Sequence, residues 1–321
     1  MANFYLTPTG GGLLDGSSWA NAFSLAEFTT WITTNALAGD FCYVLEGTYT
    51  FTADINSALD GTAVAPISVM GVKAETTNEP PVYSDWALLA ADRPVFACGA
   101  YIYQLDNYWH TYNVSFTGTS GALAREDAGA LFWNCKANNT SGVAARYGFF
   151  NFDYGRLVSC EAISTNGSAI ITEITRIIMS YVHDSNIGIN TLYGNYNTAL
   201  HCVIDTCVTG VSLGNFGHNI INSTIYGCTT GISSSSSHSG LFINNIINDC
   251  TTGVSWTTEQ KSNFWDFNNF EGNGTARTNV TAGNNDTAVD PQFTNAAGGD
   301  FSLASGSGCI DAGQSLELGV G

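Results

Sequence analysis

The residues of this sequence best suited to acid–base chemistry are His183 and Asp205, which are separated by the length of one sequence repeat, and Asp184 follows the histidine directly. A histidine beside a carboxylate can transfer protons near neutral pH, because the ordinary pKa of imidazole is about 6.5. The same pair is also an ordinary stabilising contact on the surface of a β-sheet. Both interpretations stay open, and we favour the structural one because no second catalytic carboxylate aligns with the pair.

A few arginines form the second candidate group. Arg125 and Arg146 each follow a Thr-Ser-Gly segment by four residues, so we expect them to stack on neighbouring turns of a repeat. Two stacked cations repel, so something negative must neutralise them. Acidic residues nearby in the chain are the simpler answer. The alternative is a small groove, with Tyr154 and Arg156 beside it, for a sugar carboxylate or an acidic residue of a partner.

The charge balance excludes two classes of partner. The chain carries 27 acidic against 9 basic residues and a net charge of −18, without any basic run. Nucleic acids and anionic membrane surfaces require clustered cations, so neither is expected as a partner. No apolar stretch is long enough for a membrane helix, and the first residues lack the features of a secretory signal.

Cysteine usage points away from disulfides and metals. The nine cysteines form an odd set and no Cys-x-x-Cys spacing occurs, so we expect reduced thiols and no zinc site. Neither a metal nor a cofactor is predicted.

A repeat of about 22 residues runs through the second half of the chain. Glycines recur at nearly constant intervals, one of which is longer than the others, and a one-residue slip is expected between the third and the fourth glycine. They are Gly121, Gly142, Gly167, Gly188, Gly210, Gly231, Gly253 and Gly274. A repeat this steady indicates a solenoid, in which each unit stacks on the next.

Within each unit apolar and polar residues alternate, which is typical of strands. Aligned units give columns of similar residues that we expect to stack inside the solenoid, about 4.8 Å apart. One column runs from Tyr112 and Trp133 to Leu200, Ile221 and Ile243, and another contains Val182, Ile204, Ile225 and Ile247. Two further columns are rich in cysteine, at Cys135, Cys160 and Cys202 and at Cys207, Cys228 and Cys250, and we interpret them as packed core residues.

The ends of such a solenoid need caps, because open strand edges pair with other chains. Ser24 followed by Glu27 fits a capping box, and apolar residues at helical spacing predict a short helix over about 24–36 that covers the first coil. We predict a single domain over 1–321. Residues 1–49 form the N-terminal cap and first strands, 50–110 irregular coils with long loops, 111–275 regular coils and 276–321 the C-terminal cap.

Both ends of the chain resemble a known superfamily. The opening residues Tyr5 to Gly10 and Asp15 to Ala20, and the closing segments Asp290 to Phe293 and Cys309 to Gly313, are similar to those of pectate-lyase-like right-handed parallel β-helix proteins, the closing ones to bacterial and phage members. The fold is therefore predicted to be all-β: a single-stranded right-handed parallel β-helix, a solenoid with coils of about 22 residues. A short N-terminal capping helix and an irregular C-terminal cap are expected at its ends.

The resemblance does not extend to the catalytic motifs of the superfamily. Its pectate lyases share an acidic calcium-binding cluster with a basic residue on one face, and its polygalacturonases share Asn-Thr-Asp, Asp-Asp, Gly-His-Gly and Arg-Ile-Lys motifs. This sequence has no Asp-Asp, Asn-Thr-Asp or Arg-Ile-Lys, and Gly217-His218-Asn219 departs from Gly-His-Gly at its last position. We therefore expect no complete catalytic set.

On these grounds the sequence favours a non-enzymatic structural or adhesive protein of a virus particle. A bacteriophage head decoration or tail-associated protein fits best, located in the virion, assembled in the host cytoplasm and docked on capsid or tail proteins, with a cell-surface polysaccharide as a further partner. The alternative is a polysaccharide lyase or glycoside hydrolase that acts in the groove of the β-helix. A third interpretation is a bacterial surface protein without its export signal.

Overall fold

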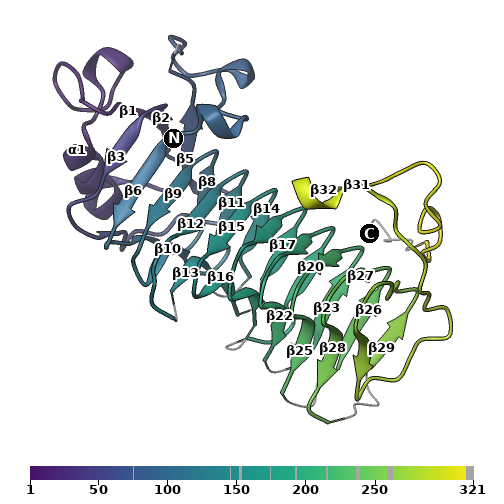
Figure 1. Ribbon diagram of the computed structural model, residues 1–321. Helices are drawn as coiled ribbons and strands as arrows, with labels where there is room; N and C mark the ends of the chain where they lie inside the picture. Colours follow the sequence, from purple (N-terminus) through teal and green to yellow (C-terminus); the bar gives the residue numbers. More distant parts are fainter. Residues whose placement is uncertain are drawn as a thin grey trace.

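The computed structural model is a right-handed parallel β-helix, in which the chain winds through three parallel sheets (Figure 1). It describes residues 1–315 except 75, 145, 152–153, 174, 192–193, 215, 236–238 and 259–262. Between β2 and β28 each coil contributes one strand to sheet A, one to sheet B and one to sheet C, in that order along the chain.

In the described residues sheet A has 11 strands, sheet B has 9 and sheet C has 10. Sheet A contains β1 (Asn3–Leu6), β2 (Phe41–Leu45), β5 (Ile67–Val72), β8 (Trp109–Tyr112), β11 (Leu131–Trp133), β14 (Arg156–Val158), β17 (Arg176–Ile178), β20 (Thr198–Leu200), β23 (His218–Ile221), β26 (Gly240–Ile243) and β29 (Asn263–Asp266). Sheet B contains β3 (Thr48–Thr50), β6 (Val95–Gly99), β9 (Ser115–Gly118), β12 (Lys136–Asn139), β15 (Glu161–Ser164), β18 (Tyr181–His183), β21 (Val203–Asp205), β24 (Thr224–Tyr226) and β27 (Ile246–Asn248). Sheet C contains β4 (Ile55–Asn56), β7 (Tyr103–Leu105), β10 (Ala122–Glu126), β13 (Tyr147–Asn151), β16 (Ser168–Thr172), β19 (Ile187–Asn190), β22 (Thr209–Leu213), β25 (Thr230–Ser234), β28 (Thr252–Trp256) and β30 (Thr275–Thr278).

The register confirms the predicted repeat. The column that contains Ile204, Ile225 and Ile247 is paired strand by strand in sheet B, and all its members are fully buried. The predicted slip is present and is larger than expected: Ser168 pairs with Ile187, so Gly188 is level with Ala169 and lies two positions beyond Gly167. From Gly188 to Gly253 the glycines stack, because a Cβ at Gly210 would lie 2.6 Å from the carbonyl oxygen of Gly231. Gly274 leaves this column, since Gly253 is followed there by Ala276.

One predicted column does not lie inside. The column from Tyr112 and Trp133 to Leu200 and Ile221 is paired as expected, but it occupies the outer face of sheet A and is only half-buried. Its last member, Ile243, is buried. The residues that point inward are those one position earlier, such as Phe132. The reason is the corner between sheets A and B, which is a single residue with positive φ. This corner reverses the side of the chain that faces the core.

That corner strongly selects residue type. A left-handed conformation costs an L-residue about 1–2 kcal/mol, and asparagine tolerates it better than most residues. Four of the corners are asparagines, and the others are a serine, a methionine, a histidine and a phenylalanine. They are Asn113, Asn134, Ser159, Met179, His201, Asn222, Asn244 and Phe267, with φ between 48° and 59°.

The cysteines pack as core residues, as predicted. Cys135, Cys160 and Cys202 are free and buried, and the column at Cys207, Cys228 and Cys250 is buried as well. Burial raises the pKa of the Cys202 thiol to about 11, so this group stays protonated at neutral pH. Cys309 alone among the nine is partly exposed.

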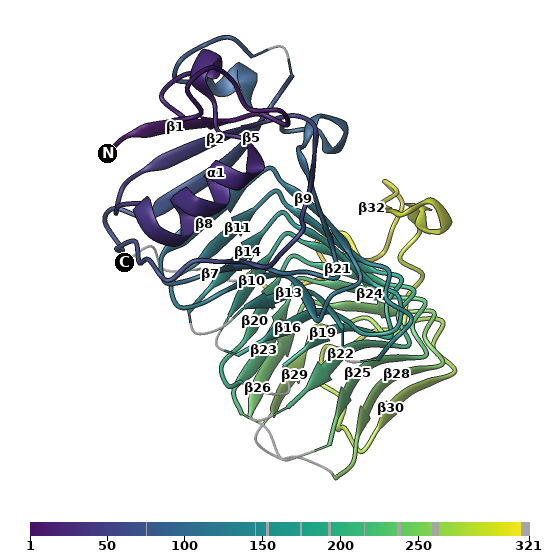
Figure 2. The same cartoon turned by 90° about the vertical axis from the view of Figure 1, so that its left-hand side faces the viewer.

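The N-terminal end is closed by the predicted helix, although it is irregular. Helix α1 (Leu25–Thr30) continues into one π-helical turn (Trp31–Asn35), and the backbone N–H of Ser24 donates to Glu27 Oε2 over 3.3 Å. Phe28 and Trp31 are buried in the main core and contact the rings of Phe96 and Trp109. Figure 2 shows α1 lying across the first strands. Three 3₁₀ turns, Trp19–Asn21, Tyr83–Asp85 and Ala90–Asp92, lie in the nearby loops.

After β30 the chain turns back along the solenoid. The hairpin of β31 (Phe293–Asn295) and β32 (Asp300–Leu303), with the 3₁₀ turn Ala296–Gly298 between its strands, packs on sheet B (Figure 1). The rings of Phe293 and Phe301 contact Tyr226, at centroid distances of 5.9 Å and 5.3 Å. No helix of the described residues is long and apolar enough to cross a membrane.

The stacked core predicts a sharp contrast between two substitutions. Ile225→Ala removes part of a fully buried ladder and should lower the free energy of unfolding by about 2–5 kcal/mol. Val208→Ala, at a side chain that is 53% exposed, should change it by no more than about 0.5 kcal/mol. Urea titrations followed by circular dichroism measure both, and equal losses would contradict the assigned register.

Candidate functional site

The two arginines expected to stack do not share a ladder position. Arg125 pairs with Phe150 in sheet C and its guanidinium lies 5.4 Å from the centre of that ring. Arg146 precedes β13 and lies level with Gly121. Counting four residues from each glycine fails because the turn after Gly142 is longer than the turn after Gly121. Arg125 and Arg146 therefore do not form the expected groove.

His183 and Asp205 pair in register, as predicted, but His183 has other hydrogen-bond partners. The ring offers Nε2 to Glu161 Oε1 at 3.2 Å and Nδ1 to Asp184 Oδ2 at 2.8 Å. Lys136 Nζ donates to the same Glu161 oxygen at 2.7 Å. We call Lys136, Glu161, His183 and Asp184 the charged ladder.

The pKa values of the charged ladder follow from these contacts. Hydrogen bonds from His183 and Lys136 lower the pKa of Glu161 to about 2. Burial works against protonation of His183, but its bonds to Glu161 and Asp184 outweigh burial and raise its pKa. Glu161 and His183 thus hold each other in their charged forms, which favours the structural interpretation of this cluster.

Asp205 lies beside the charged ladder in a different network. Its Oδ2 accepts a hydrogen bond from the Tyr181 hydroxyl at 3.3 Å, and burial raises the pKa of the carboxyl group. The Tyr181 ring stacks on the His183 ring with centroids 4.2 Å apart. The hairpin covers part of this face, because a Cβ at Gly299 would lie 3.3 Å from the Tyr181 hydroxyl.

The remaining predicted residues, Tyr154 and Arg156, line an open cleft at the turn from sheet C to sheet A. Its volume is about 570 Å³, and its lining is Tyr154, Gly155, Arg156, Thr175, Arg176 and Tyr196. Arg156 and Arg176 pair in register, so two cations occupy consecutive rungs. No carboxylate of the described residues forms an ion pair with either. We call this the arginine cleft.

Two exposed tyrosines flank the arginines. Tyr154 and Tyr196 are 72% and 67% exposed and both have positive φ, 61° and 58°. Such strained conformations of bulky residues concentrate at functional sites. The Tyr196 ring lies against Gly217, where a Cβ would approach it to 2.4 Å, so only glycine leaves room for the ring on that rung.

A neutral histidine lies outside the cleft lining, on the same column of sheet A. His110 stands on the same outward column as Arg156, two rungs earlier, and its Nδ1 lies 3.1 Å from the Tyr112 hydroxyl. Burial and the charge of Arg156 lower the pKa of His110 to about 4. The imidazole is therefore uncharged at neutral pH and can accept a proton.

The sequence analysis missed Arg176, Tyr196 and His110. A signal for Arg176 was present: Arg156 and Arg176 each stand two residues before Val158 and Ile178, which belong to one aligned column. The described residues hold no group of three or more His, Cys, Asp or Glu placed to bind a metal ion.

Comparison with known proteins identifies the architecture. No protein-family model matches the sequence, and a search of curated proteins found no match. Among solved structures, pectate lyase Pel9A superposes with a TM-score of 0.56 at 14% identity, over 99% of this chain and 93% of that one. XylC in complex with xylose gives 0.53 at 8% identity, over 87% and 70%. The PL6 family alginate lyase AlyGC gives 0.50 at 12% identity, over 80% of this chain and 39% of that one.

These similarities confirm the parallel β-helix of pectate-lyase type and correct the predicted function. The first prediction, a non-enzymatic bacteriophage decoration or tail-associated protein, is wrong: the similar structures include polysaccharide lyases, and nothing in them supports a virion component. They favour the enzyme that the sequence analysis had placed second. The expected lack of a catalytic set rested on motifs that lie close together in the sequence, whereas the arginine cleft gathers residues from three coils.

The charged ladder predicts a defined pH dependence of stability. Because its pKa is lowered, ionised Glu161 stabilises the folded protein above pH 4.5, the ordinary pKa of this group. This stabilisation is lost as the pH falls toward about 2. Because its pKa is raised, protonated His183 stabilises the folded protein below pH 6.5. This stabilisation is lost as the pH rises through the pKa that His183 has in the folded protein. Glu161→Gln should therefore destabilise the protein most between pH 4.5 and 6.5, by about 1 kcal/mol.

Melting temperatures of the wild type and Glu161→Gln across this range measure the effect. Asp249→Asn is the control, because Asp249 accepts a hydrogen bond from Tyr226 and contacts no histidine among the described residues. A difference between wild type and Glu161→Gln that stays constant with pH would show that His183 and Glu161 are not coupled.

Proposed function

We propose that this protein is a polysaccharide lyase that binds a uronate unit of an acidic polysaccharide in the arginine cleft. The observation that carries the proposal is the pair Arg156 and Arg176. They lie on consecutive rungs without an ion-pair partner among the described residues, although the chain as a whole carries a net charge of −18. Guanidinium groups bind carboxylates in a two-pronged geometry, and an anion between them relieves their repulsion.

The cleft suits an extended sugar chain. It is open, about 570 Å³ in volume, and Tyr154 and Tyr196 present rings on which the apolar faces of sugars can stack. The proposed substrate class thus follows from one pair of charges and two aromatic rings.

The lining favours elimination over hydrolysis. A glycoside hydrolase needs two carboxyl groups that flank the scissile bond, about 5–9.5 Å apart. The described lining of the arginine cleft contains no aspartate or glutamate. Elimination needs instead a cation to neutralise the uronate carboxylate, a base and a proton donor.

The chemical step balances with groups of this chain. With the carboxylate held by Arg156 and Arg176, a base removes the proton from the adjacent carbon, a carbon–carbon double bond forms, and the glycosidic carbon–oxygen bond breaks. The departing oxygen takes up a proton. His110, neutral because its pKa is about 4, is the proposed base, and the hydroxyl of Tyr154 or Tyr196 is the proposed donor.

Substitution of the cleft arginines tests the binding mode. Arg156→Ala and Arg176→Ala should each weaken the binding of polygalacturonate and alginate oligomers about tenfold or more, because a charge-assisted contact is lost. Arg146→Ala is the matched control, since Arg146 lies before β13 and outside the cleft lining. Isothermal titration calorimetry measures all three, and a loss in Arg146→Ala equal to that in the cleft variants would reduce the effect to overall charge.

Turnover tests the chemistry. Cleavage of the same oligomers should produce unsaturated ends with ultraviolet absorbance, and kcat/KM should rise with pH through the pKa of His110, about 4. His110→Gln should lower kcat about 100-fold, whereas His201→Gln, at an exposed corner of another coil, should not. Saturated, hydrolysed ends would rule out the lyase, and an unchanged kcat in His110→Gln would remove this residue as the base.

A further inference from the structure

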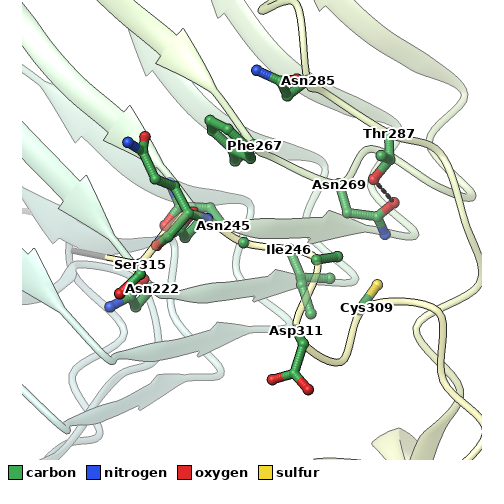
Figure 3. Close-up of a pocket in the computed structure, with 14 residues that line it drawn as sticks. Asn222, Asn245, Ile246, Phe267, Asn269, Asn285, Thr287, Cys309, Asp311 and Ser315 are labelled. Atoms are coloured by element: carbon green, nitrogen blue, oxygen red, sulfur yellow. Dashed lines mark hydrogen bonds between the residues drawn. The ribbon is translucent and has the colours of Figure 1, made fainter.

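A second pocket lies at the other edge of sheet A, near the C-terminus. It has a volume of about 470 Å³ and is formed where residues 309–315 fold back over the corners between sheets A and B. Its main polar lining is Asn222, Asn244, Asn269, Asn285 and Thr287. Figure 3 shows the ring of Phe267 among these side chains, with Cys309 and Asp311 of the returning segment opposite. We call this the amide pocket.

The C-terminal segment that forms one wall of the amide pocket is hydrogen-bonded to the solenoid. Asn244 Nδ2 donates to the carbonyl oxygen of Gln314 at 2.9 Å, and Asn244 Oδ1 accepts from the backbone N–H of Gln314 at 2.8 Å. Gly313 fits closely here, because a Cβ would lie 3.0 Å from the Asn244 side chain. These contacts hold the returning segment against the corner at Asn244.

Phe267 occupies a position that suits asparagine. The preceding corners of this edge, Asn222 and Asn244, are asparagines, whereas Phe267 adopts the same left-handed conformation with φ 56°. An aromatic residue in this conformation is strained, and strain of this kind points to a role other than folding. Its ring is only half-buried and lines the pocket.

Hydrogen-bonding groups without a partner among the described residues line the same pocket as the ring. The Asn222 side chain has no hydrogen-bond partner among the described residues. Asn285 donates from Nδ2 to Asp266 Oδ2 at 2.9 Å, and its Oδ1 is without a partner in the described part of the chain. An aromatic face next to amides that can donate and accept matches the two surfaces of a pyranose ring, its apolar face and its hydroxyl edge.

The charge of the pocket selects against acidic ligands. Its described lining contains no lysine or arginine, and Asp311 is the one carboxylate there. From this geometry we propose that the amide pocket binds an uncharged sugar unit, stacked on Phe267 and held by Asn222 and Asn285. This site is separate from the arginine cleft and does not rest on the function proposed for it.

The experiment compares two sugars that differ chiefly in charge. Saturation-transfer difference NMR is recorded with methyl galactopyranoside and with galacturonic acid, which has the same ring stereochemistry but a carboxylate at C6. We expect transfer to the neutral sugar, and about tenfold weaker binding of it in Phe267→Asn. This substitution removes the ring and keeps the fold, because asparagine already occupies the corners at 222 and 244. Methyl glucopyranoside and methyl mannopyranoside are recorded as well, to allow for stereochemistry.

Met179→Asn is the matched control, since Met179 is a corner residue with φ 48° that lies outside the pocket. It should bind the neutral sugar as the wild type does. The proposal is overturned if none of the three neutral sugars gives a signal, if Phe267→Asn binds as well as the wild type, or if galacturonic acid binds Arg156→Ala, whose arginine cleft is impaired, as well as the neutral sugar does. Arg156→Ala separates the two sites: it should leave neutral-sugar binding unchanged even if polyuronate binding is lost.

Discussion

The backbone hydrogen bonds between successive coils are the constraint on which the rest of this structure depends. The backbone N–H of Arg156 donates to Ala130 of the coil before it, that of Arg176 donates to Gly155, and the same pattern continues along sheet A. Because the inner strands are bonded in register on both sides, a side chain cannot move along the axis without breaking a ladder. Two arginines are thus held one rung apart despite their repulsion, and the folded coils supply the energy that keeps them there.

The corners decide where chemistry can occur. Side chains within the strands either fill the core or lie flat on an outer face, whereas the turns project away from it. The arginine cleft and the amide pocket lie at the two ends of the sheet A strands, one at the turn from sheet C and the other at the turn to sheet B. At both edges aromatic residues occupy left-handed positions, Tyr154 and Tyr196 at one and Phe267 at the other. The rigid coils stabilise these strained backbone conformations, and the aromatic rings lie at the edges of sheet A.

The sequence predicted the ladders well, because a periodic fold turns sequence spacing into spatial contact. His183 and Asp205 pair as expected, and the column through Ile225 is buried as expected. Spacing alone could not show that the Tyr112 column faces outward, since one left-handed corner residue reverses the alternation. It also failed for Arg125 and Arg146, where turns differ in length. The amide pocket could not be predicted from spacing, because Asn244 and Gln314 are 70 residues apart and belong to no shared repeat.

The uneven exposure of the cysteines makes the native protein selective toward thiol reagents. Eight sulfur atoms are shielded within the stacked coils, and one, at Cys309, borders the amide pocket. A maleimide dye or nitroxide label would therefore attach at this one position without prior mutagenesis. Placed there, it would report directly on whether the returning C-terminal segment stays seated against the solenoid or lifts away from it.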